Sequence, residues 1–95
     1  MSGYRIHRQV TEFGEHVRGW RMVLGLTAQQ VSERAGITRD TLRKIESGNP
    51  NVSFNSVTQV LRALGILDQI VDAADPLASD IGRLRAGRLT RTRAR

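Results

Sequence analysis

The stretch that decides the fold is Ala28-Gln-Gln-Val-Ser-Glu-Arg-Ala-Gly-Ile-Thr-Arg-Asp-Thr-Leu-Arg-Lys-Ile-Glu46. Its apolar residues recur at helical spacing, and Gly36 divides it into two short halves. Because glycine tolerates positive φ, a tight turn between two helices is expected there. Ser32 and Ala35 are small enough to let the helices touch. The inner side of the pair is expected to consist of Val31, Ile37, Leu42 and Ile45. The pattern predicts a helix-turn-helix over about residues 27–47, with Thr27 and Thr38 as helix caps.

Further helices are expected on both sides of this motif. Before it, Thr11 can cap a helix that Gly25 ends, with an apolar stripe of Phe13, Val17, Trp20 and Leu24. We interpret Trp20 as a core residue. After the motif, Ser53 can cap a fourth helix that Gly65 ends, carrying Phe54, Val57, Val60, Leu61 and Leu64. A fifth segment carries Ile66, Leu67, Ile70 and Val71. With no strand pattern, the prediction is an all-α, five-helix domain over residues 11–76.

The two ends of the chain differ from this domain. Residues 1–10 are expected to form a loose lead-in. Residues 77–95 contain six arginines and one aspartate, so they carry +5 of the formal net charge of +6. Residues 1–76 contain nine basic and eight acidic residues and carry only +1. The basic composition therefore belongs mostly to the tail, which we expect to be flexible and either disordered or only transiently helical.

Composition and motifs argue against several classes of protein. The chain has no cysteine, which excludes disulfides and cysteine-based zinc sites. An apolar signal core and a long apolar run are both missing, so a cytoplasmic protein is expected. No catalytic constellation stands out, so we expect neither an enzyme nor a cofactor. His7 and His16 are not expected to form a metal site: Glu12 stands one helical turn before His16, but two ligands without a third are a weak signal, and solvated histidines are the expected account.

The second helix of the motif has a polar outer face. The apolar spacing leaves Arg39, Asp40, Thr41, Arg43 and Lys44 on that face. A helix presented in this way fits the major groove of DNA, with its first turn nearest the base edges. The outer face therefore predicts contact with double-stranded DNA.

The segment from about Phe13 to Ile70 resembles the XRE-type, lambda-repressor-like helix-turn-helix family, a five-helix DNA-binding fold. The matching residues are Arg21, Gly25-Leu-Thr27, Val31, Ala35-Gly-Ile-Thr38, Leu42, Ile45-Glu46, Gly48 and Leu64-Gly65. The sequence departs from the family at Ala28, where a phosphate-contacting glutamine is usual, and at Ser32, where alanine is usual.

The resemblance implies roles for particular residues. Base-reading positions correspond to Arg39, Asp40, Thr41 and Lys44. For Asp40 a second interpretation stays open, since a carboxylate in the first turn also favours the helix dipole. Expected phosphate contacts are Thr27, Gln29, Gln30, Arg43, Ser47, Asn49 and Asn51. Arg21 and Glu46 correspond to an ion pair that sets the angle of the reading helix; two independently solvated charges are the alternative.

A palindromic operator requires two copies of the reading helix, so a homodimer is expected. The candidate interface is Ile66, Leu67, Ile70 and Val71, although this segment could instead close the core. Residues 48–53, 60–66 and 75–77 with the basic tail also resemble HipB-type antitoxins, which are encoded beside HipA-family kinase toxins. The resulting hypothesis is a repressor that regulates its own operon and restrains a toxin. The alternatives are a stand-alone XRE-type regulator and an interaction module that no longer reads DNA.

Overall fold

The computed structural model describes residues 2–94, with side chains placed for residues 3–90. Within that range every regular element is helical, which confirms the all-α prediction. The helices, in chain order, are α1 (Ser2–Val23), α2 (Ala28–Ala35), α3 (Arg39–Glu46), α4 (Phe54–Ala63), α5 (Leu67–Ala73), a short 3-10 helix η1 (Pro76–Ala78), α6 (Asp80–Leu84) and α7 (Gly87–Ala94).

The predicted helix-turn-helix is formed by α2 and α3. Thr27 begins α2 with a capping box, in which its Oγ1 accepts from the Gln30 amide at 3.0 Å and its own amide donates to Gln30 Oε1 at 2.9 Å. Gly36 ends α2 in the left-handed conformation, at φ 69°. Thr38 then caps α3 by accepting from the Thr41 amide. Each boundary satisfies backbone groups that a short helix would otherwise leave unpaired.

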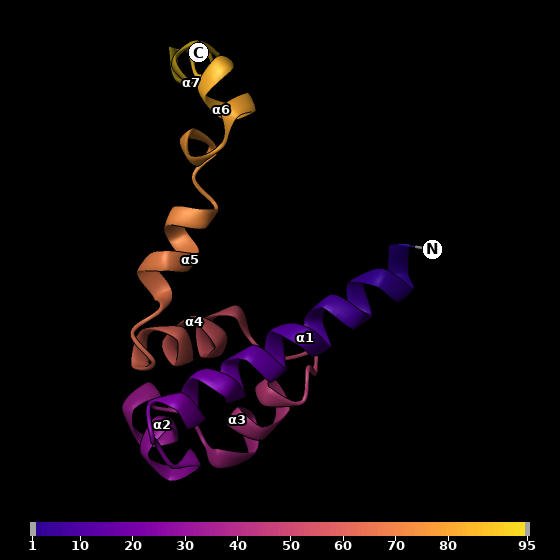
Figure 1. Ribbon diagram of the computed structural model, residues 1–95, viewed down its shortest axis with the longest axis vertical. Coiled ribbons are helices and arrows are strands. Elements are labelled where there is room, and N and C mark those ends of the chain that lie inside the picture. Colours follow the sequence, from indigo (N-terminus) through magenta and orange to yellow (C-terminus); the bar gives the residue numbers. More distant parts are fainter. Residues whose placement is uncertain (1, 95) are drawn as a thin grey trace.

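The core lies between the first four helices and includes Leu64 and Ile66, which follow α4. In Figure 1, α1 crosses the motif; it packs on α3, while α2 packs on α4. The buried apolar side chains are Val17, Val31, Ala35, Leu42, Ile45, Val60, Leu61, Leu64 and Ile66. The predicted inner residues of the motif are among them, except Ile37, which is partly buried against the same cluster. Ser32 is also buried, and its hydroxyl has no hydrogen-bond partner in the described part of the chain.

The start of α1 differs from the prediction. A loose lead-in over residues 1–10 was expected, but the helix already begins at Ser2; Met1 lies outside the described residues. Thr11 does not cap the helix, because its hydroxyl donates to the His7 carbonyl one turn earlier, at 3.0 Å. A threonine hydroxyl can make either bond, and no proline interrupts residues 2–10. The sequence pattern therefore could not choose between the two starts.

The inner face of α1 also differs from the expected stripe. Trp20 is 41% exposed and Leu24 is exposed as well, so the prediction of a core tryptophan was wrong. Gly14 and Val17 are buried instead. A Cβ on Gly14 would lie 2.5 Å from the Ile45 carbonyl oxygen and 2.8 Å from that of Glu46. The closest approach of α1 to α3 is therefore at a glycine, which a search for apolar side chains overlooks.

Residues 67–94, here called the C-terminal arm, extend away from residues 2–66, which we call the body (Figure 1). The radius of gyration is 16.3 Å, against about 12 Å for a compact chain of this length. The tail was expected to be either disordered or transiently helical, and up to residue 94 the structure shows the short helices η1, α6 and α7 there. Asp75 caps η1, and Ser79 caps α6 by accepting from the Gly82 amide. These caps stabilise local helices that composition alone does not reveal.

Candidate nucleic-acid interface

The outer face of α3 carries three cationic side chains and one carboxylate. Arg39, Asp40, Arg43 and Lys44 are all exposed. Thr41 differs from these four because it is half-buried, and its hydroxyl accepts from that of Thr38 at 3.0 Å. Thr41 therefore belongs to the cap of α3 in this structure. The cationic side chains, in contrast, project from a helix whose opposite side is buried through Leu42 and Ile45.

Asp40 is engaged by two cations of its own helix. Arg43 Nη2 lies 2.5 Å from Asp40 Oδ1, and Lys44 Nζ lies 3.4 Å from Oδ2. The hydrogen bond from Arg43, and then that from Lys44, hold the pKa of the Asp40 carboxyl below its ordinary value. The stability that this interaction gives is present above the unfolded-state pKa and is lost as pH falls through the folded-state value. At neutral pH Asp40 is therefore a carboxylate that holds Arg43 and Lys44 on one side of α3.

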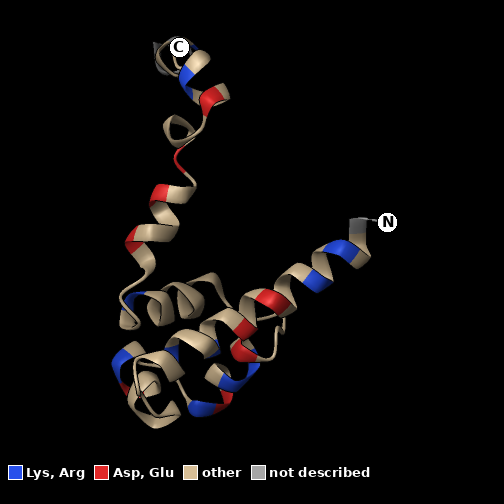
Figure 2. Cartoon of the chain, in the orientation of Figure 1, with Lys and Arg blue, Asp and Glu red and all other residues tan. Residues whose placement is uncertain are grey.

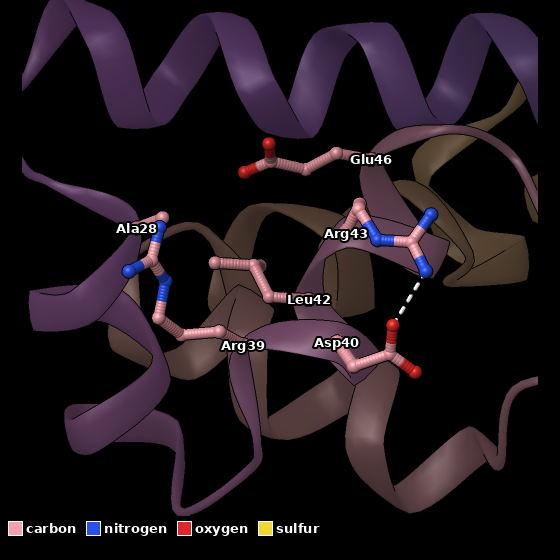
Figure 3. A pocket seen from close by; sticks show the side chains of 6 residues that line it. All are labelled: Ala28, Arg39, Asp40, Leu42, Arg43 and Glu46. Atoms are coloured by element: carbon pink, nitrogen blue, oxygen red, sulfur yellow. Dashed lines mark hydrogen bonds and ion pairs between the residues drawn. The ribbon is translucent and has the colours of Figure 1, made fainter.

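A depression of about 460 Å³ lies between the start of α2 and the outer face of α3. Figure 3 shows its lining: Arg39 reaches toward the Ala28 side, whereas Arg43 turns toward Asp40. Its remaining walls are Leu42 and Glu46. Of the two arginines that line the depression, Arg39 is the one drawn beside the small side chain of Ala28 (Figure 3).

The ion pair of Arg21 and Glu46 connects α1 to the last residue of α3. Arg21 Nε lies 2.7 Å from Glu46 Oε2, and Nη2 lies 3.0 Å from Oε1. A third hydrogen bond runs from Arg21 Nη1 to the Leu26 carbonyl, at 3.3 Å. Both side chains are largely shielded from solvent, at 15% and 11% exposure. The hydrogen bond to Glu46 raises the pKa of Arg21. This bidentate contact fixes the angle of α3 relative to α1.

Apart from Arg43, the residues expected to contact phosphate lie at the start of α2 and in the loop that follows α3. Thr27 and Gln30 form the capping box of α2, and Gln29 is exposed beside them. After α3, the Ser47 hydroxyl donates to the Lys44 carbonyl at 3.0 Å, and Asn49 Oδ1 accepts from the Asn51 amide at 2.7 Å. All of these residues are exposed, although most already make a local hydrogen bond.

Three residues position the interface, and two of them, Gly14 and Arg62, were not anticipated from the sequence. Gly14 lets α3 end against α1, and at Gly48 a Cβ would lie 2.6 Å from the Thr11 Cα. Arg62 on α4 donates to the Arg34 carbonyl at 2.9 Å, which connects α4 to the end of α2. For Gly14 the only available signal was a glycine in the middle of a helix, which usually has a packing reason. For Arg62 the sequence offered no signal.

The proposed dimer residues divide into two groups. Ile66 is 6% exposed and belongs to the core, so its assignment to an interface is corrected by its burial. Leu67 is partly buried against the same cluster. Ile70 and Val71 are exposed on α5. The segment therefore closes the core at its start and presents apolar side chains to solvent further along.

Comparison of the sequence with known proteins agrees with this architecture. A family model described as a helix-turn-helix domain matches residues 12–74. An uncharacterized HTH-type transcriptional regulator of Methanothermobacter thermautotrophicus is 39% identical over 49 residues, which cover 52% of this chain and 71% of that protein. No solved structure matches the chain significantly. The chain belongs to the XRE-type helix-turn-helix family of DNA-binding transcriptional regulators.

Among residues 2–94, no helix combines the length and apolar character needed to span a bilayer. The same part of the chain contains no group of three or more histidine, aspartate or glutamate side chains placed to hold a metal ion.

Proposed function

We propose that this protein is a sequence-specific repressor that binds a palindromic operator as a homodimer. The observation that carries the proposal is the exposed cationic face of α3, held at a fixed angle by the Arg21–Glu46 ion pair. A reading helix must keep its orientation when it meets the groove, since small misplacements lose hydrogen bonds to base edges.

The exposed residues divide into two proposed roles. Arg39 and Lys44 read bases, because each can donate to guanine O6 and N7. Arg43 contacts phosphate, together with the polar residues at the start of α2 and in the loop after α3: Thr27, Gln29, Gln30, Ser47, Asn49 and Asn51. For Asp40, its engagement by Arg43 and Lys44 supports a positioning role more than direct reading of cytosine.

The test is fluorescence anisotropy with the DNA upstream of the protein's own coding sequence and with scrambled DNA, each at two salt concentrations. Arg39→Ala should weaken operator binding by about 1–3 kcal/mol, as expected for a lost bidentate base contact. Its effect on scrambled DNA should be much smaller. Arg18→Ala is the matched control, because Arg18 is an exposed arginine on α1.

Two results would contradict this proposal. Equal binding of operator and scrambled DNA by the unmodified protein, at both salt concentrations, would favour an interaction module that does not read sequence. Equal losses on both DNAs for Arg39→Ala would instead mean that Arg39 contacts phosphate.

A finer proposal is that the repressor is also the antitoxin of a HipA-like kinase toxin. The exposure of Phe54 supports this proposal. Phe54 follows the antitoxin-like stretch 48–53 directly, and its side chain is 82% exposed. An aromatic side chain in that position suits a protein partner. The test is co-expression with the adjoining gene: if that gene encodes a kinase-like toxin, this chain should relieve its growth inhibition, and Phe54→Ala should reduce the relief. Without such a neighbour, the stand-alone regulator is the better account.

A further inference from the structure

The C-terminal arm separates its charges along the chain. Residues 67–82 contain four aspartates and no lysine or arginine, whereas residues 83–95 contain six arginines and no acidic residue. Figure 2 shows acidic positions along α5 and in the connection to α6, and basic positions beyond them. Asp68 and Asp72 are one helical turn apart, so they lie in the same row on α5.

Both halves of the arm also expose apolar side chains. The acidic half presents Ile70 and Val71, and the basic half presents Leu84 at 85% exposure and Leu89 at 41%. Isolated apolar residues on a surface are ordinary, but a series of them along one extended arm marks an interaction surface. Such a surface should meet a partner that covers apolar and charged side chains together.

The arm neutralises its charges only in part within the described residues. Arg83 pairs with Asp80, three residues before it, and donates to the Leu77 carbonyl. Within the described part of the chain, neither Asp68 nor Asp72 forms an ion pair, and both are exposed. The acidic row on α5 thus remains available to an external cationic segment.

We propose that the arm is a reciprocal dimerisation arm, in which the acidic α5 of one copy packs against the basic α6–α7 segment of a second copy. In a two-fold symmetric dimer this contact forms twice, so both acidic rows and both basic segments find partners. DNA is a less suitable occupant, because four aspartates would face phosphate and the exposed leucines would gain nothing there. The inference rests on the homodimer of the proposed function and is independent of its DNA contacts.

The experiment measures the oligomeric state of the full-length chain by sedimentation equilibrium, without DNA. One variant carries Asp68→Lys and Asp72→Lys; the other carries Arg85→Glu and Arg88→Glu. Each alone should raise the dimer dissociation constant roughly tenfold or more, because like charges then face each other across the contact. An equimolar mixture should form a heterodimer about as tight as the wild-type dimer. Glu33→Lys, an exposed reversal on α2, serves as the control and should change nothing.

The mixture distinguishes this proposal from its alternatives. If the arm folded back on its own chain, mixing the two variants would restore nothing, and the proposal would be overturned. A wild-type dimer that both reversals leave intact would overturn the arm contact while leaving the homodimer and its DNA binding in place. A monomeric wild-type chain at high concentration would also overturn it. Circular dichroism of each variant verifies that the helices are retained, and the neutral pair Asp68→Asn and Asp72→Asn gives a milder version of the same test.

Discussion

Gly14 is a residue at which the backbone of α1 lies directly against the end of α3. It lies in the middle of α1, where glycine costs up to about 1 kcal/mol relative to alanine. That cost is offset here because the absent side chain lets the last turn of α3 approach the helix. Gly48 has the same effect directly after α3, because its absent side chain lets the chain pack against the Thr11 backbone.

Gly14→Ala should therefore destabilise the protein despite the better helix propensity of alanine. The new Cβ would press on the carbonyl oxygens of Ile45 and Glu46, and overpacking of this kind costs about 1–3 kcal/mol. Gly19→Ala is the matched control, because nothing lies within 4 Å of the position of its Cβ; it should stabilise by about 0.5–1 kcal/mol. Urea unfolding of both variants gives the comparison. A stabilised Gly14→Ala protein would mean that α1 and α3 are further apart than the structure shows.

Residue by residue, the sequence was most informative where a residue has one structural use. Thr27, Thr38 and Gly36 were predicted as caps and turn, and they occupy those places. Arg21 and Glu46 were paired on the strength of a resemblance, since they are 25 positions apart and no local pattern connects them. Trp20 was misplaced because a large apolar side chain on a helix is consistent with either the core or the surface.

At the scale of elements, α1 is longer than its packing requires. The side chains of residues 3–9 are all exposed, and the Arg8–Glu12 ion pair, at 3.9 Å, lies on the surface. Exposed pairs of this kind contribute little to stability. The first turns project past the body in Figure 1.

A chain that begins at Gln9 should consequently unfold with nearly the same free energy, within about 0.5 kcal/mol. By comparison, Val17→Ala removes a buried side chain from the same helix and should cost about 2 kcal/mol. Thermal and urea unfolding measure both. A loss of more than about 1 kcal/mol on truncation would show that the first turns do contact the rest of the molecule.

The helices that were predicted well and those that were missed differ in a physical respect. α2, α3 and α4 combine a capping side chain, a buried apolar face and a terminating turn, so three independent signals agree. α6 has a cap at Ser79 but no buried residue, and its sequence is rich in arginine and glycine. Composition favoured disorder there, while local hydrogen bonds decided the conformation.

Considered as a whole, the molecule consists of a packed body and an extended arm, and the two have different roles in the proposed operator binding. Among residues 3–90, every buried apolar residue lies between Val17 and Ile66. The arm therefore adds little to the stability of a single copy. Its proposed effect is to join two bodies, so that the second reading helix binds at a high effective concentration.

A chain that ends at Ala74 should retain the melting temperature of the body but lose that advantage. Its affinity for a full two-half-site operator should fall by roughly 10²–10⁴-fold, the usual gain from connecting two binding modules. Binding to a single half-site should be unchanged. Anisotropy titrations with the two DNAs make the comparison, and an equal loss on the half-site would indicate that the arm touches DNA directly.

The way in which α3 packs on the body also affects how the preference for DNA sequence can diverge in related regulators. Gly14, Gly48 and the Arg21–Glu46 contact hold the helix by its backbone and its final residue, away from the four exposed side chains of its outer face. Altering Arg39, Asp40, Arg43 or Lys44 therefore leaves the support of the helix unchanged. Under the proposed function, new operator preferences could therefore be selected or engineered at these positions with little loss of folding, whereas a change in docking angle would require substitutions in the body.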